Sequence, residues 1–107
     1  AELVKRYPDS QYAPDARARM VYLRNTMAQS ELDVASYYLR RGAWIAAVNR
    51  ARFLLDNYQG APQTHDALAI LVQAYRELGE TELANDSLAV LKLNAPEHPF
   101  LTGAPIE

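Results

Sequence analysis

Residues 37–58 read YYLRRGAWIAAVNRARFLLDNY, a stretch that predicts two helices joined at a single glycine. Gly42 is the break, because glycine adopts the positive φ that ends a helix at little cost. Two helices on so short a connection pack antiparallel against each other. Beyond the glycine, apolar residues recur at intervals of three and four, as on the buried face of an amphipathic helix: Ala47, Val48, Ala51, Leu54, Leu55 and Tyr58.

The rest of the chain extends this helical pattern in both directions, and no strand pattern is found. Pro14 suits a first helical position, where its missing N–H costs nothing, and Gly79 closes a later helix as Gly42 closes the earlier one. Residues 1–7 look like the end of a further helix, which Pro8 terminates. The prediction is an all-α fold with main helices at 14–41, 43–58, 64–78 and 82–94.

Three finer expectations concern the methionines of the first long helix, one helix cap and the C-terminal tail. Met20 and Met27 keep the helical spacing of the first long helix, so they are expected to fill the core. Thr81 is expected to cap the last main helix. The tail from Phe100 onward contains two helix breakers, which predicts that it is frayed or held by a neighbour.

A repeat with a period of 37 residues relates two helical hairpins. The matched positions carry the same residue type: Tyr38 with Tyr75, Gly42 with Gly79, Ala47 with Ala84, and Leu54 with Leu91. This order is typical of tetratricopeptide repeats, whose usual period of about 34 implies an insertion in the loop at 59–64. The repeats then lie near 28–61 and 65–98, and 1–8 is the end of an upstream repeat. Since two repeats alone seldom fold stably, upstream helices are expected against the first half of helix 14–41.

Composition and charge exclude several classes of function. The net charge is only −2. Residues 1–52 hold nine Lys and Arg against five Asp and Glu, whereas residues 53–107 hold two against eight. This asymmetry suggests partners of opposite charge at the two ends, but it is too weak for a nucleic-acid-binding protein. The sequence has no apolar run long enough to span a bilayer.

No pattern for catalysis or metal binding is present. The sequence contains no Cys, which rules out a disulfide framework, a thiolate metal site and a Cys nucleophile. His65 and His98 are the only histidines, and they lie far apart without metal-ligand spacing. Nothing resembles a nucleophile elbow. We therefore predict a protein that is not an enzyme and needs neither a cofactor nor a metal.

The hairpin also carries the features of a binding surface. It holds the only Trp of the chain, Trp44, together with the densest cluster of positive charge: Arg40, Arg41, Arg50 and Arg52. Aromatic residues and arginines are enriched at protein–protein interfaces. We therefore predict that this hairpin both organises the fold and binds a partner.

Three segments carry a more specific resemblance: RYPDSQYAPDARARMVYLRN (6–25), VASYYLRRGAWIAAVNRARFLLDNYQGAPQTHDAL (34–68) and AYRELGETELA (74–84). They resemble the C-terminal half of the BamD family (also called ComL or YfiO), the tetratricopeptide lipoproteins of the bacterial β-barrel assembly machinery. The resemblance covers about residues 1–96. Its most specific motif is YYxxRGAWxAAVNR, at residues 37–50, which general tetratricopeptide proteins do not share.

The resemblance implies a periplasmic scaffold at the inner face of the outer membrane. It implies an anchor on a lipidated Cys that this chain does not contain. The implied partner is the last POTRA domain of BamA, the barrel-forming subunit, with small lipoproteins of the same complex as further partners. Arg50 matches the family's Arg of the VNR motif, which lies at the BamA contact, and Arg41 matches the Arg of RGAW. Gln59 departs from the family, in which Tyr-Pro is common at this corner.

The candidate partner-binding residues are Arg50, Arg41, Arg40, Asn49, Trp44 and Tyr37. For Arg50 the choice is between an interface anchor and a solvated helix arginine, and the resemblance favours the anchor. Trp44, two residues after the turn glycine, is expected to be partly buried at the hairpin tip, with an exposed contact as the alternative. Tyr38 belongs to the core by its place in the repeat, whereas Tyr37 is free to face a concave groove.

Two other functions stay open from the sequence. One is a tetratricopeptide adaptor that binds a peptide tail in its concave groove, through residues of the first helix of each pair, such as Tyr37 or Gln73. The other is a regulatory or substrate-positioning domain of a larger enzyme. Binding that depends on Arg50 would favour the scaffold over the adaptor. In the full-length gene, a lipobox Cys upstream would favour the scaffold, whereas a catalytic domain would favour the enzyme.

Overall fold

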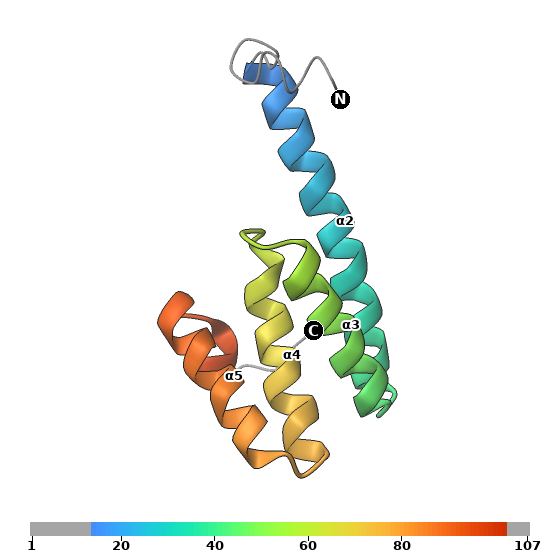
Figure 1. Cartoon of the computed structure of the whole chain (residues 1–107), viewed down its shortest axis with the longest axis vertical. Helices are drawn as coiled ribbons and strands as arrows, with labels where there is room; N and C mark the ends of the chain where they lie inside the picture. Colours follow the sequence, from blue (N-terminus) through green and yellow to red (C-terminus); the bar gives the residue numbers. More distant parts are fainter. Residues whose placement is uncertain (1–13, 103–107) are drawn as a thin grey trace.

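The computed structural model describes residues 14–102, which form a row of antiparallel α-helices and one short 3₁₀ helix (Figure 1). Each main helix packs against the next, and the first also contacts the third. No strand occurs between residues 14 and 102, so the predicted all-α fold of helical hairpins is confirmed. The elements are α2 (Pro14–Arg40), α3 (Trp44–Asn57), α4 (Gln63–Glu77), α5 (Thr81–Asn94) and η1 (Pro99–Thr102).

The four main helices begin and end within one residue of the predicted positions. The helix end predicted at 1–7 lies outside the described residues. The cap prediction at Thr81 is wrong, because Thr81 is already the first residue of α5 and Glu80 holds the N-cap position without a side-chain cap. The first helical bond explains this start, since the Ala84 N–H donates to the Glu80 carbonyl at 2.9 Å. In the described part of the chain, none of the helices has the length and hydrophobicity to cross a membrane.

The two inter-helix turns have the same backbone geometry. Gly42 and Gly79 have φ values of 77° and 79°. After the first, the Ala43 N–H donates to the Tyr38 carbonyl at 2.9 Å, and after the second, the Glu80 N–H donates to the Tyr75 carbonyl at 2.9 Å. This bond, from the residue after the glycine back to the last turn of the helix, satisfies a carbonyl that the helix leaves unpaired. The 37-residue repeat therefore corresponds to two turns of the same backbone geometry. The repeat boundaries near 28–61 and 65–98 stay a prediction.

The core lies between α3 and α4 and is closed by α2 on one side and α5 on the other. The core contains many alanines, whose small side chains allow the helix backbones to approach closely. The large side chains that solvent does not reach are Leu54, Ile70, Val72 and Leu91, and the fully buried alanines include Ala35, Ala47, Ala51, Ala67 and Ala74.

The first half of α2 projects beyond the other helices (Figure 1). Met20 and Met27, which were expected in the core, are 50% and 55% exposed. The helical spacing that identified them is real, but α3 and α4 pack on another part of α2. There Ala28, Leu32 and Leu39 are buried. The large apolar residues of α2 left exposed are Met20, Val21, Tyr22, Leu23, Met27, Val34 and Tyr37.

The C-terminal segment follows the second of the two expectations as far as Thr102, because neighbouring residues hold it. Phe100 and Leu101, in η1, are half-buried against the core. The turn before them is fixed by His98, whose ring bonds both the Asp66 carboxylate and the backbone N–H of Phe100. Residues 103–107 lie outside the described residues.

Candidate functional site

Arg50 extends from α3 toward α2 and forms an ion pair between the two helices. Its Nη1 lies 3.0 Å from Oε1 of Glu31. The side chain of Arg50 is 41% exposed and that of Glu31 is 22% exposed, so both groups are only partly withdrawn from water. The guanidinium carbon also lies 5.9 Å from the ring centroid of Phe53, one helical turn further along α3. Arg50 is thus held between a carboxylate and an aromatic ring.

An open cleft of about 370 Å³ adjoins this pair and is lined by Tyr38, Ala46, Asn49, Arg50 and Phe53. All of these except Tyr38 lie on α3, on successive turns of one helix face. Asn49, which was predicted to bind a partner, is exposed at this cleft. Arg50 and Asn49 therefore present a charged group and an amide side by side at the opening of the cleft.

The remaining predicted residues gather at the tip of the α2–α3 hairpin. Arg40 and Arg41 are exposed, and the Arg41 guanidinium carbon lies 5.6 Å from the ring centroid of Tyr37. Trp44 is half-buried, as expected, and lines a second, shallow cleft with Ile45 and Leu78. This tip is therefore a mixed surface of arginines and apolar side chains.

Tyr38 and Ala46 join the tip to the Arg50 cleft. The rings of Tyr37 and Tyr38 meet edge to face, with centroids 5.7 Å apart. Ala46 lines both clefts. Tyr38, which was predicted to lie in the core, is partly buried and packs against it, and Tyr37 is exposed. The structure thus brings five of the six predicted residues onto one connected surface, with Arg40 beside it at the turn.

The match to a known family covers most of the chain. A family model described as YfiO, outer membrane lipoprotein, matches residues 1–91. The chain belongs to the YfiO family. This confirms the family that the three sequence segments indicate.

Several relatives of this YfiO-family chain are named outer membrane protein assembly factor BamD. The protein of Xylella fastidiosa strain Temecula1 is 50% identical over 101 residues, which are 94% of this chain and 34% of that protein. The protein of Neisseria meningitidis serogroup A is 50% identical over 104 residues, which are 97% of this chain and 39% of that protein. The Haemophilus influenzae protein is 38% identical over 105 residues, 98% of this chain and 38% of its own length.

The chain therefore spans between about a third and two-fifths of the length of these YfiO-family relatives. Which part of them it corresponds to stays a prediction of the sequence resemblance.

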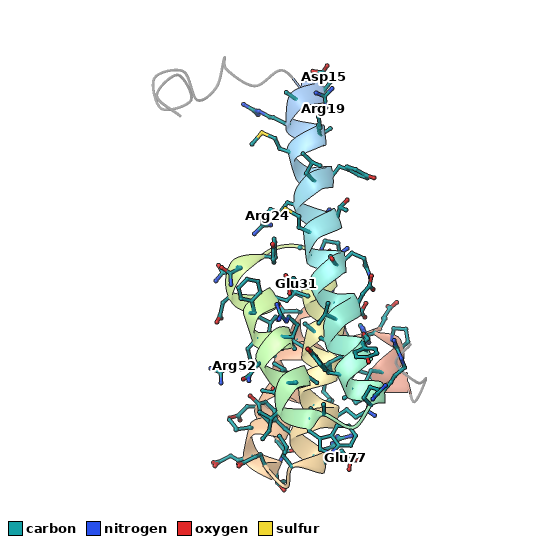
Figure 2. All side chains as sticks on the ribbon, turned by 90° about the vertical axis from the view of Figure 1, so that its right-hand side faces the viewer. Asp15, Arg19, Arg24, Glu31, Arg52 and Glu77 are labelled. Atoms are coloured by element: carbon teal, nitrogen blue, oxygen red, sulfur yellow. The ribbon has the colours of Figure 1, made fainter. Side chains whose placement is uncertain are left out.

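Sequence reasoning missed two residues of the site, Glu31 and Phe53. Glu31 had one visible signal, because it interrupts the apolar spacing of the first long helix with a charge. Its pairing with Arg50, 19 residues away in sequence, can be identified only once the packing of α2 on α3 is known. Arg52, counted with the basic cluster, points away from the bundle (Figure 2), and Glu31 lies where α3 packs on α2.

The described residues offer no arrangement typical of metal binding. Between residues 14 and 102, no group of three or more His, Asp or Glu side chains is placed to hold a metal ion. His98 engages Asp66 instead, and both of its ring nitrogens are used in that contact and in the bond from Phe100.

Proposed function

We propose that the chain is a non-catalytic docking segment of an outer-membrane protein assembly factor. The YfiO family description and the names of the relatives support the assembly-factor part of this role. The proposed partner is the POTRA region of BamA, which the sequence resemblance implies. The proposed location is the periplasmic side of the outer membrane, with an anchor outside this chain and small lipoproteins of the same complex as further partners.

The observation that carries the proposal is the presentation of Arg50. Its guanidinium sits at the opening of a cleft on two packed helices, still 41% exposed, with Tyr38 and Phe53 beside it. An arginine can donate two parallel hydrogen bonds to a carboxylate, which lysine cannot reproduce. Apolar neighbours exclude water from such a bond when a partner covers them. We infer that Arg50 fixes the orientation of an acidic group of the partner.

The direct test is calorimetry of the 107-residue chain against the POTRA fragment of BamA from the same organism. Arg50→Glu is expected to weaken binding by at least about thirtyfold, as for a residue at the centre of an interface. Arg50→Lys keeps the charge but loses the two-bond geometry, so an intermediate loss of about tenfold is expected.

Arg52→Glu is the matched control, because it reverses the same charge on the same helix two residues away and Arg52 points away from the bundle. It is expected to change binding by less than about threefold. Circular dichroism checks that each variant keeps its helices. Equal binding by wild type and Arg50→Glu would contradict the proposal, and loss of binding with Gln73→Ala alone would favour the peptide adaptor.

A further inference from the structure

Arg50 would be a long, flexible side chain if nothing restrained it. In the structure two groups restrain it from different directions. Glu31 Oε1, on α2, accepts a hydrogen bond from Nη1 at 3.0 Å, and the ring of Phe53, on α3 itself, lies 5.9 Å from the guanidinium carbon. Only the Glu31 contact comes from another helix. It therefore ties the direction of the arginine to the α2–α3 packing.

Glu31 is itself well placed to hold that position. Its side chain is the more buried of the two, at 22% exposed, and it lies on α2 between buried neighbours, Ala28, Leu32 and Ala35. A carboxylate on this covered part of α2 has less conformational freedom than one on the exposed first half of the helix. The guanidinium has five N–H donors, and the bond to Glu31 uses the Nη1 end. Donors thus remain for a partner.

We propose that Glu31 is a positioning residue that holds Arg50 in the orientation in which it docks. This rests on the proposed function of Arg50. The physical reason is preorganisation: a side chain that is already ordered loses less conformational freedom when it binds. The same pairing also compensates the charge of Arg50. Binding at this site is therefore expected to depend more on the fixed geometry of the guanidinium than on long-range attraction between charges.

Three variants separate these effects. Glu31→Gln keeps an oxygen acceptor but loses the charge that strengthens the bond to arginine. Glu31→Ala removes the acceptor altogether. Asp33→Asn is the control, because it removes the same charge from α2 two residues away, at an exposed position where Asp33 bonds only its helix neighbour Gln29 among the contacts described.

The first measurement needs no partner. Relaxation of the Arg50 side-chain Nε–H group by ¹⁵N NMR should show an ordered group in wild type and Asp33→Asn. It should show a less ordered group in Glu31→Gln and a mobile one in Glu31→Ala. A purely structural role for Glu31 would change the melting temperature instead and leave the order of Arg50 unaltered. We expect the melting temperature of Glu31→Gln to shift by less than about 5 °C, as for a partly exposed ion pair.

The second measurement is binding to the POTRA fragment. Glu31→Ala should weaken binding by about three- to tenfold, with Glu31→Gln between it and wild type, and Asp33→Asn should match wild type. In an Arg50→Ala background, Glu31→Ala should have no additional effect, because the residue acts through Arg50. Binding by Glu31→Ala as tight as or tighter than wild type, while Arg50→Glu loses binding, would overturn the role of Glu31 alone. Unchanged binding by Arg50→Glu would overturn the docking function itself.

Discussion

Single residues carry the two turns that set the fold. Gly42 and Gly79 both adopt positive φ, and each precedes a residue whose N–H closes the preceding helix. A Cβ added at Gly42 would lie 3.8 Å from the nearest atom, a ring carbon of Trp44, and one at Gly79 would meet nothing within 4 Å. Space is therefore available at both positions, and the requirement for glycine comes from the backbone conformation alone.

Replacing either glycine tests this directly. Gly42→Ala and Gly79→Ala should each lower the free energy of unfolding by about 1–2 kcal/mol, the cost of a left-handed conformation for an L-residue. Asparagine tolerates that conformation better, so Gly42→Asn should cost less than Gly42→Ala. Urea denaturation measures the three values. An equal cost for Ala and Asn would mean that something other than φ determines the loss.

His98 links the end of the chain to α4. Its Nδ1 accepts the Phe100 N–H at 3.0 Å, so in the neutral ring the proton lies on Nε2, which donates to Oδ1 of Asp66. The His98 side chain is nearly buried, and Phe100 next to it packs on the core beneath Arg76. These contacts hold η1 in place, the second of the two outcomes that the sequence left open for this tail.

His98→Ala should therefore release η1 while leaving α2 to α5 in place. Loss of the two hydrogen bonds is expected to cost about 1–2 kcal/mol, discounted because Asp66 is half exposed. Amide hydrogen exchange of Phe100 and Leu101 should accelerate strongly. Asp66→Asn, which keeps an acceptor for the Nε2 proton, should produce a smaller change. Unchanged exchange at Phe100 in His98→Ala would show that core packing alone holds η1.

Among the helices, α2 differs from the others, because only part of it is covered. Its second half buries Ala28, Leu32 and Leu39, while Met20 and Met27 remain exposed. Arg24 still reaches the bundle, where its guanidinium carbon lies 5.8 Å from the ring centroid of Tyr58. The expectation that upstream helices cover the first half of α2 stays a prediction.

This difference gives a matched pair of substitutions. Leu54→Ala removes a fully buried side chain and should cost about 2–5 kcal/mol of unfolding free energy. Met27→Ala, at an exposed position in the 107-residue chain, should change stability by less than about 0.5 kcal/mol. Chemical denaturation of both variants decides the matter. A large loss in Met27→Ala would show that another part of the chain covers this side of α2.

The helices were predictable because their signals are local. Glycine and proline mark the ends, and apolar residues at intervals of three and four mark the buried faces, so the boundaries agree within one residue. Met27 shows the limit of such signals, since periodicity identifies an apolar face without saying what covers it. The pairing of Glu31 with Arg50 was out of reach for a related reason, because it depends on how far α3 is displaced along α2.

For the molecule as a whole, the arrangement agrees with the proposed docking function. The described helices form a row with the Arg50 surface on the α2–α3 side, and η1 closes the opposite end against α4 (Figure 1). Positive charge gathers in residues 1–52 and negative charge in residues 53–107. This asymmetry agrees with the proposed acidic partner, and the ion pair with Glu31 reduces the net charge that Arg50 presents to it.

The central claim is that the partner docks on the surface around Arg50. The most direct measurement is a two-dimensional ¹H–¹⁵N NMR titration of the chain with the POTRA fragment. We expect the backbone signals of Tyr38, Ala46, Asn49, Arg50 and Phe53 to shift or broaden together, while Gly60, His65 and Asn94, in the cleft between α3, α4 and α5, stay unchanged. Shifts confined to the cleft between α3, α4 and α5, with Arg50 and its neighbours unaffected, would contradict the claim.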